Sequence, residues 1–259
     1  MIFDRVLLTG AAGKVGSCLR SGLRDGLAEL RLSDRAPISA SAPNETFVAA
    51  ELEDFSAVMD AVSGVDAVVH LGAVPDEAGF DVIAGPNLHG VYHVFEAARR
   101  CGVRRVVFAS SNHATGFYPV SARLTGREPV RPDGLYGASK AYGEALGRMY
   151  HDRFGLSVVC VRIGSFTDRP TVPRHLSTWL SPGDAVRLFR ACLSAPDVGF
   201  EVVYGASANT RGWWDLSSGR ALGYEPVDDA EDYAGAVSDE PVGEAQGGPN
   251  TDPSHGGWT

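Results

Sequence analysis

The sequence predicts an α/β protein built on a doubly wound parallel sheet, with a small C-terminal portion for binding a substrate. Short apolar runs alternate with helical patterns along most of the chain, which is the order expected for βαβ units. The runs Val106–Phe108 and Val158–Val161 are continuously apolar, as in strands that are buried on both faces. A glycine-rich loop follows the first strand and precedes a helix. These features favour a parallel sheet covered by helices on both sides.

The individual elements follow from the same patterns. In the longest helical segment the apolar side chains Val91, Val94, Phe95 and Ala98 recur at the spacing of one helix face. The expected strands are Arg5–Leu8, Glu29–Leu32, Thr46–Ala49, Ala67–His70, Arg105–Ala109, Val158–Ile163 and Phe200–Tyr204. The expected helices are Lys14–Arg24, Asp54–Val62, Phe80–Arg100, Tyr136–Phe154 and Asp184–Leu193.

The pattern fades after about Asp228. We expect one domain over residues 1–259, with the substrate-binding segments mainly in 164–240. Residues 241–259 are rich in glycine and polar side chains and are expected to form an extended tail that packs on another surface.

The amino-acid composition limits the classes of function that the protein can have. Hydrophobic residues make up 44% and charged residues 21% of the 259, which is typical of a globular protein with a sizeable core. Lys and Arg number 23 against 32 Asp and Glu, giving a net charge of -9. No basic cluster indicates a nucleic-acid surface. An anionic ligand would therefore need a cation placed locally.

The start of the chain does not read as a signal peptide, because Asp4 and Arg5 interrupt the apolar stretch. No run approaches the roughly 20 apolar residues of a membrane span, so no membrane partner is expected. The four cysteines are widely spaced and form no CxxC pair, which indicates reduced thiols, no metal site and a cytoplasmic protein. They are Cys18, Cys101, Cys160 and Cys192.

The loop Thr9–Gly16 carries glycines at the spacing G-x-x-G-x-x-G. Gly10 permits a tight turn, Gly13 lets the backbone approach a pyrophosphate, and Gly16 allows the helix to pack closely on the sheet. Unpaired N–H groups at the helix N-terminus favour phosphate. The sheet is therefore expected to be of Rossmann type, with a dinucleotide held by Gly10, Ala12, Gly13, Lys14, Val15 and Gly16.

Asp34 ends the second strand, 18 residues after Gly16, close to the position of the carboxylate that binds a ribose 2′-OH. Arg35 could pair with a 2′-phosphate, but Asp34 would repel that group, so NAD is favoured over NADP. Further strand-end residues could frame or cover the cofactor, although they are also ordinary strand ends. They are Glu51, Leu52, Leu71, Gly72 and Ala73.

Tyr136 and Lys140 lie four residues apart at the start of a helix and share one of its faces. A lysine ammonium beside a phenol stabilises the phenolate and is expected to lower the pKa of Tyr136, which would make it a usable base. Ser111, at the end of the preceding strand, could hydrogen-bond both a substrate oxygen and the tyrosine. The alternative for that serine is simple turn capping.

These motifs resemble the extended short-chain dehydrogenase/reductase superfamily. The resemblance rests on TGAAGKVG, Asp34, FASSNH (Phe108–His113) and YGASK (Tyr136–Lys140), and Asn87 matches the family's structural asparagine, which supports a water near the lysine. Within the superfamily the chain resembles uronate dehydrogenases. The matching stretches are Phe108–Pro119, Arg131–Glu144, Val161–Ser165, Arg174–Ser181, Val202–Asp215 and Gln246–Gly248.

The resemblance implies NAD-dependent oxidation of D-glucuronate or D-galacturonate at C1 to an aldarolactone, which opens to the aldarate. Tyr136 would act as the base, Lys140 would lower its pKa and hold the nicotinamide ribose, and Ser111 would orient the reacting oxygen. It further implies that the sugar site is lined by Ser111, Asn112, His113, Ser165 and Arg174. His113 could equally be a packed loop histidine.

Arg174 is the expected partner of the sugar carboxylate, because its planar fork matches a carboxylate in two hydrogen bonds. The alternatives are a surface salt bridge with Asp168, and Arg169 as the substrate cation. One departure from the family pattern is Pro75, which stands where a serine is expected and puts the substrate preference in question.

Two other functions remain open at this stage. One is a nucleotide-sugar epimerase or dehydratase with the same Tyr–Lys pair, although the short stretch after Ile163 suits a smaller substrate. The other is a non-catalytic NAD-binding sensor, although sensors of that kind often lack the tyrosine or the lysine. A homo-oligomer is expected, since this superfamily commonly pairs through the helix with the Tyr–Lys motif and its predecessor.

Overall fold

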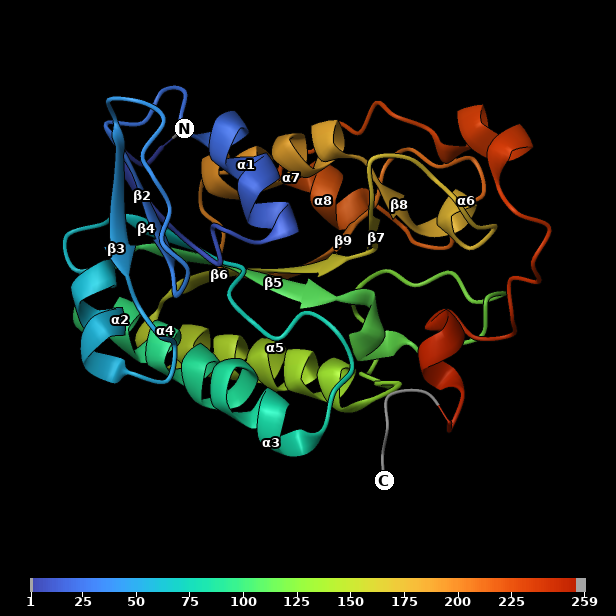
Figure 1. Cartoon of the computed structure of the whole chain (residues 1–259), viewed down its shortest axis with the longest axis horizontal. Coiled ribbons are helices and arrows are strands. Elements are labelled where there is room, and N and C mark those ends of the chain that lie inside the picture. Colours follow the sequence, from blue (N-terminus) through green and yellow to red (C-terminus); the bar gives the residue numbers. More distant parts are fainter. Residues whose placement is uncertain (1, 255–259) are drawn as a thin grey trace.

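The fold is a seven-stranded parallel sheet covered by helices on both faces, in a computed structural model that describes residues 2–254 (Figure 1). The strand order is β3-β2-β1-β4-β5-β6-β9. Each strand expected from the sequence is present. Their bounds are β1 Arg5–Thr9, β2 Glu29–Asp34, β3 Glu45–Ala49, β4 Ala67–His70, β5 Arg105–Ser111, β6 Ser157–Ile163 and β9 Phe200–Gly205.

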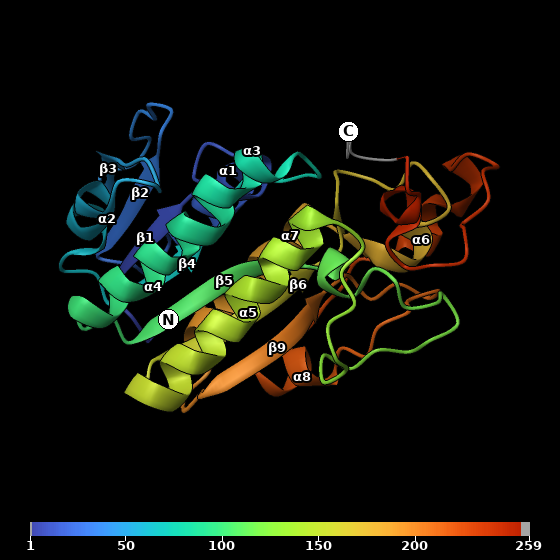
Figure 2. The same cartoon turned by 90° about the horizontal axis from the view of Figure 1, so that it is seen from below.

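The helices form two layers (Figure 1). One face of the sheet is covered by α1 (Lys14–Leu23), α7 (Pro182–Ser194) and α8 (Ser217–Ala221). The other is covered by α2 (Phe55–Val62), α4 (Gly90–Arg100) and α5 (Leu135–Phe154), which are in front when the molecule is seen from below (Figure 2).

The single helix expected over Phe80–Arg100 is divided. It begins as α3 (Phe80–Ile83), continues through a π-helical turn at Ala84–His89, and becomes α4. Pro86 lies inside the π turn and has no N–H to donate, which accounts for a wider turn at this point.

The continuous apolar runs behave as expected for strands covered on both sides. Val106 and Val158 pack in the cluster with Phe95 and Tyr150 on the α4–α5 side, whereas Val107 and Val159 pack on the opposite side. Both faces of the sheet are therefore core.

The sheet changes winding direction between β1 and β4, which are neighbours although two strands separate them in sequence. Thr9 and His70 end these strands, and their side chains are 2.7 Å apart, Oγ1 to Nδ1. In a doubly wound sheet the crevice outside this point is where ligands bind. All seven strands run the same way, so the residues at their carboxyl ends meet there.

The C-terminal part adds small elements beyond β6. They are the two-stranded parallel sheet of β7 (Ser165–Phe166) and β8 (Trp179–Leu180), α6 (His175–Thr178), and 3₁₀ turns at Ala230–Ala236 and Gly248–Thr251. The tail packs back on the chain's own surface, where Ala245 pairs antiparallel with Pro119. Residues 255–259 of the expected tail lie outside the described residues.

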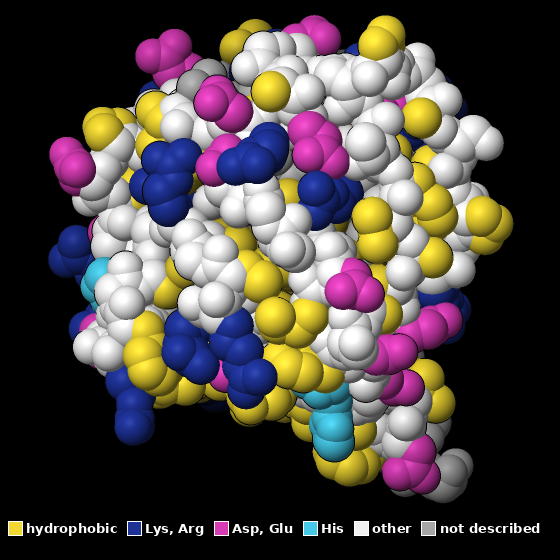
Figure 3. Space-filling model, turned by 90° about the vertical axis from the view of Figure 1, so that its left-hand side faces the viewer, with side chains coloured by type: hydrophobic (Ala, Val, Ile, Leu, Met, Phe, Trp, Pro, Cys, Tyr) yellow, Lys and Arg dark blue, Asp and Glu magenta, His cyan; other side chains and the backbone are white. Residues whose placement is uncertain are grey.

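Within residues 2–254 no helix is long and apolar enough to cross a membrane, and the four cysteines are unbridged. On the face at the β3 edge, positive and negative side chains lie side by side (Figure 3).

Candidate active site

The glycine loop has the geometry that a phosphate cradle requires. Gly10 has φ +66°, and a Cβ there would lie 2.6 Å from the Gly72 backbone nitrogen. A Cβ at Gly16 would collide with the Gly10 carbonyl, so only glycine lets α1 start this close to the loop. Gly13 is the N-cap of α1 and brings no capping side chain, which leaves the first N–H groups of the helix available.

Asp34 lies beside this loop, where its two carboxylate oxygens accept from Ala12 N and Ala36 N, each at 3.0 Å. These bonds fix the carboxylate at the end of β2, while each oxygen keeps a lone pair for a ribose hydroxyl. Arg35 is exposed. Lys14 reaches across to donate to Phe166 O at 3.2 Å, so the loop is joined to β7.

The other expected cofactor contacts surround the same crevice. Gly72 packs on Gly10 and on the Leu52 side chain, and Leu71 and Ala73 flank it after β4. Glu51 is exposed at the rim.

Asn87 joins two parts of the protein. Its amide oxygen accepts from Val74 N at 2.7 Å, and its nitrogen donates to Val74 O and Ser139 Oγ. Both N–H groups are therefore used, whereas the amide oxygen keeps a second lone pair that can accept from a water. Asn87 thus ties the loop after β4 to α5, and its support of a water near Lys140 stays a prediction.

Tyr136, Lys140 and Ser111 meet as expected at the carboxyl end of β5. Ser111 hydrogen-bonds the Tyr136 phenol, and the Lys140 Nζ lies 5.5 Å from the Tyr136 ring centroid. Lys140 is buried and donates to Ala109 O at 2.9 Å, which fixes its direction. Ser110 faces the other way and donates to Glu144, so only one hydroxyl of the serine pair belongs to the site.

The expected lowering of the tyrosine pKa is wrong for the protein alone. Burial raises the pKa of Tyr136 to about 12, the Ser111 hydrogen bond opposes this rise, and the Asp76 and Asp133 charges add to it. Burial also lowers the pKa of Lys140 to about 8. Loss of hydration outweighs the neighbouring lysine, because both groups are buried together.

Glu77 caps the N-terminus of α5, the helix that carries Tyr136 and Lys140. The sequence patterns did not predict this role. Its carboxylate oxygens accept from Leu135 N at 2.8 Å and from Tyr136 N at 3.0 Å. The N-cap residue Gly134 has no capping side chain, and a Cβ there would collide with the Glu77 carboxylate. A helix beginning at glycine without a local cap is the signal that a remote carboxylate supplies one.

His113 and Asp133 form a second pair beside the tyrosine. His113 Nδ1 is 2.7 Å from Asp133 Oδ2, and the His113 ring contacts the Tyr136 ring edge-on at 5.9 Å between centroids. Asp133 is fully buried at its side chain, and its Oδ1 has no partner among the described residues. The aspartate leaves His113 Nε2 as the atom free to meet a substrate, which favours the site over the packing interpretation of His113.

Arg174 lies in the site, but its fork is already bound. Its Nε and Nη2 donate to Gln246 O at 2.9 and 2.7 Å, and Nη1 donates to Ser165 Oγ at 3.0 Å. With the Asn112 amide oriented to satisfy its neighbours, Asn112 Oδ1 accepts from Nη2 at 2.8 Å. One N–H, on Nη1, stays without a partner among the described residues, so the expected two-bond grip on a carboxylate is not available in this arrangement. Burial lowers the pKa of Arg174 to about 10, against the attraction of Asp133.

Among residues 2–254, Arg174 forms no salt bridge with Asp168, so that alternative is absent. Arg169 is exposed, and its alternative role as the substrate cation stays a prediction.

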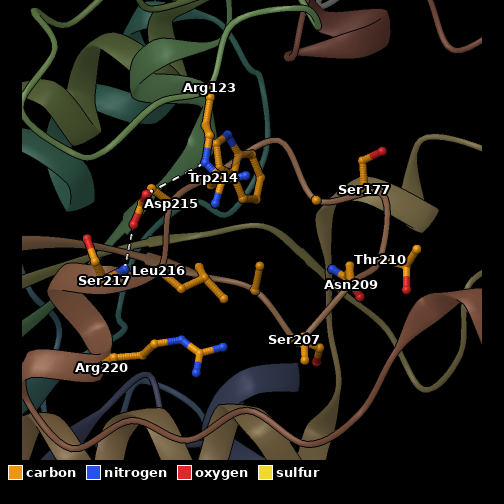
Figure 4. A pocket seen from close by; sticks show the side chains of 13 residues that line it. Arg123, Ser177, Ser207, Asn209, Thr210, Trp214, Asp215, Leu216, Ser217 and Arg220 are labelled. Atoms are coloured by element: carbon orange, nitrogen blue, oxygen red, sulfur yellow. Dashed lines mark hydrogen bonds and ion pairs between the residues drawn. The ribbon is translucent and has the colours of Figure 1, made fainter.

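A separate hollow of about 280 Å³ lies beside Trp214 (Figure 4). It is lined among others by Arg123, Asn209 and Arg220, and by none of the site residues expected from the sequence. Trp214 belongs to both regions, because its Nε1 donates to Gln246 Oε1 at 2.8 Å.

Comparison with known proteins agrees with this geometry. Residues 6–181 match the model of the NAD dependent epimerase/dehydratase family. The chain is 47% identical over 241 residues to a uronate dehydrogenase of Pseudomonas putida, covering 93% of this chain and 90% of that one. It is 40% identical to an NAD-dependent glucose-6-phosphate dehydrogenase of Haloferax volcanii, covering 93% and 98%.

Among solved structures, a tyrosine-to-alanine mutant of uronate dehydrogenase from Agrobacterium tumefaciens, complexed with NAD, superposes with a TM-score of 0.92 at 44% identity. The superposition covers 96% of this chain and 97% of that one. With its phosphate loop, its strand-end Asp34 and its Tyr–Lys–Ser cluster, this chain belongs to the NAD dependent epimerase/dehydratase family, and within that family it groups with the uronate dehydrogenases.

Proposed function

We propose that this protein oxidises hexuronates, D-glucuronate and D-galacturonate, at C1 with NAD. The observation that carries the proposal is the meeting, at one end of the sheet, of the Tyr136–Ser111 pair with the buried guanidinium of Arg174. His113 contacts the Tyr136 ring and binds Asp133, and the Asp133 charge acts on Arg174, so the reacting centre and a cation lie in one region. A hexuronate carries both a reactive C1 hydroxyl and a carboxylate.

The chain's residues divide the work as follows. Ionised Tyr136 takes the proton of the C1 hydroxyl, and Ser111 holds the same oxygen. Bound NAD supplies the acceptor for the hydride from C1 and, in its oxidised form, a positively charged ring. The C1–O bond becomes the carbonyl of an aldarolactone, which water opens to the aldarate. Lys140, whose direction is fixed by its hydrogen bond to Ala109 O, would hold the nicotinamide ribose.

NAD is held by the glycine loop and by Asp34. The fit rests on the close approach that Gly10 and Gly16 allow and on the open N-terminus of α1. Residues after β3 and β4 border the cofactor, namely Glu51, Leu52, Leu71, Gly72 and Ala73.

The sugar is held by Ser111, Asn112, His113, Ser165 and Arg174. Arg174 contributes its charge and the remaining N–H on Nη1 rather than a two-bond fork. Pro75 is exposed in the loop after β4 and has no hydroxyl or N–H, so it cannot donate the hydrogen bond that a serine at this position would give a sugar.

The test is NADH formation, followed by absorbance, with glucuronate, galacturonate, glucuronamide, glucose, glucose 6-phosphate and UDP-glucose. We expect rapid turnover of both uronates and weak turnover of glucose and of the uncharged amide. Faster oxidation of glucose 6-phosphate than of either uronate would assign a phosphosugar instead. Tightly retained NAD without net NADH would favour an epimerase, and no turnover of any sugar would favour a sensor.

We further propose that two copies pair through α4 and α5. These two helices carry exposed apolar side chains, including Tyr92 (44% exposed), Tyr142 (38%) and Met149 (40%). Figure 2 shows the layer that the two helices form. Sedimentation of the parent should give a dimer or a multiple of it, and the double variant Tyr92→Glu, Tyr142→Glu should sediment as a monomer. A monomeric parent would exclude the pairing.

We also infer that residues 1–259 act as one domain in the cytoplasm. All four cysteines are unbridged and burial raises the pKa of the Cys160 and Cys192 thiols, which suits a reducing compartment. Fractionation of the source cells should place the protein with cytoplasmic markers.

A further inference from the structure

The motif Gln246-Gly247-Gly248 lies outside the segments expected to bind substrate, yet it contacts Arg174 directly. We propose that Gln246 is a positioning residue that fixes the Arg174 guanidinium and thereby sets the preference for a carboxylate over a neutral sugar. This inference rests on the proposed function.

Gln246 uses all of its polar groups. Its side-chain nitrogen donates to Pro119 O and Ala122 O, and its side-chain oxygen accepts from Trp214. Its backbone N–H donates to Tyr118 O at 2.9 Å, which leaves the backbone carbonyl as the acceptor for Arg174. Gln246 is 1% exposed. A carbonyl fixed by four other hydrogen bonds is a rigid anchor.

The two glycines explain why the segment can lie so close. A Cβ at Gly247 would collide with the Asp133 carboxylate. Gly248 has φ +62°, and a Cβ there would lie 2.9 Å from Arg174 Cδ. Only glycine fits at each position, so the motif presses the backbone onto the two charged side chains of the site.

The anchor determines which part of Arg174 faces the substrate. Gln246 O binds the edge formed by Nε and Nη2, and Nη1 is directed to Ser165. The Thr178 hydroxyl donates its hydrogen to Arg174 O, so in its contact with Ser165 it must be the acceptor. The Ser165 hydroxyl therefore donates to Thr178, and its oxygen accepts from the guanidinium. Without the Gln246 carbonyl, the guanidinium could rotate about its last torsions and lose this direction.

Trp214 makes the anchor sensitive to the Gln246 side chain. The ring stacks on Tyr204 at 4.8 Å and lines the hollow of about 280 Å³ (Figure 4), so there is space beside it. When its hydrogen bond to Gln246 is removed, the ring has room to move, and the carbonyl of residue 246 loses one of its supports.

The test compares Gln246→Met, which keeps the length but removes the amide, with Glu244→Met. Glu244 is an exposed residue of the same segment, and its change should leave the kinetics of the parent unaltered. For Gln246→Met we expect the KM for glucuronate to rise about 10-fold, with kcat and the KM for NAD changed less than about 2-fold. The kcat/KM for glucose should stay near that of the parent, so discrimination between the two sugars shrinks. Equal loss with both sugars would mean a merely structural role and overturn the proposal.

A second arm separates positioning from general damage. In an Arg174→Ala background, Gln246→Met should cause no further loss of kcat/KM for glucuronate, because the group that it positions is absent. Additive losses would overturn the proposal. If circular dichroism shows that Gln246→Met does not fold, Gly248→Ala replaces it as the test variant. That change perturbs Arg174 and leaves the glutamine in place, and it must show the same shift in sugar preference. A parent without activity on uronates contradicts the proposed function, whereas an active parent with an unaffected Gln246→Met contradicts only this inference.

Discussion

Glu77→Ala is expected to weaken both the fold and the catalytic centre, because this carboxylate is the cap of α5. Two N–H groups of the first helical turn, at Leu135 and Tyr136, lose their acceptors. Loss of an N-cap costs about 0.5–2 kcal/mol, and loss of a negative charge at a helix N-terminus costs about 0.3–1 kcal/mol. The sum is about 1–3 kcal/mol, which corresponds to a fall in Tm of ~2–12 °C for a chain of this size.

The catalytic effect follows from the same bonds. The backbone of Tyr136 is one of the groups released, so its phenol loses part of its fixed position, and kcat should fall about 3- to 10-fold. Scanning calorimetry and NADH formation measure the two effects. Glu77→Gln keeps an acceptor without the charge and should lie between the parent and the alanine variant.

Glu240→Ala is the control, because Glu240 is an exposed carboxylate outside any helix. It should change Tm by less than about 2 °C, in line with an ordinary surface substitution. A Glu77→Ala protein with the Tm and kcat of the parent would refute the capping argument.

Three further predictions concern the base, the cofactor and acid stability. Tyr136→Phe should bind NAD as the parent does in a fluorescence titration, and its kcat should be at least ~10²-fold lower. The kcat of the parent should rise with pH toward the ionisation of the phenol. A pH-independent kcat, with the chemical step rate-limiting, would contradict the role of Tyr136 as the base. Asp34→Ala should raise the Kd for NAD and narrow the preference for NAD over NADP, whereas a parent that uses both cofactors equally would exclude the role of Asp34. Burial lowers the pKa of His70 to about 3, so the unfolded chain binds a proton below pH 6.5 that the folded protein rejects. Stability from this group is then lost at about 1.4 kcal/mol per pH unit between pH 6.5 and 3, and His70→Asn should flatten that part of a urea-unfolding series.

The cofactor half of the site could be predicted from the sequence because it is local. Gly10 follows β1, Asp34 ends the neighbouring β2, and Gly16 lies in the first turn of α1. The φ of Gly10 and the close approach of the Gly10 carbonyl to Gly16 require the two glycines. The buried strands could also be predicted, because burial on both faces leaves a continuous run of apolar residues in the sequence. Asn87 was expected to support a water near Lys140, but its position in the sequence does not show that both its N–H groups bind Val74 and Ser139.

The substrate half was less predictable because it joins segments far apart in the chain. Asp133 and Gln246 lie in stretches that resemble the uronate dehydrogenases, but the sequence patterns assigned no role to either residue. Arg174 was expected to offer a fork that Gln246 O already occupies. The pKa of Tyr136 was expected to fall, whereas burial raises it to about 12. Desolvation depends on the whole surrounding fold, and a pair four residues apart says nothing about it.

The charges of the site suggest how an acidic protein selects an anion. With a net charge of -9 the long-range field opposes a carboxylate, so selection must come from short-range contacts. Arg174 is half-buried and loses hydration in the site, and Asp133, whose charge acts on it, is hydrogen-bonded to His113 instead. A buried cation without a full ion pair is unfavourable by itself, and a substrate carboxylate would relieve that cost where a neutral hexose would not. The hydrogen bonds to Gln246, Ser165 and Asn112 satisfy the N–H groups of Arg174 but bring no negative charge. The guanidinium is therefore held in place by neutral hydrogen-bond partners. On the proposed function, the substrate carboxylate would add to the compensation that Asp133 gives its charge.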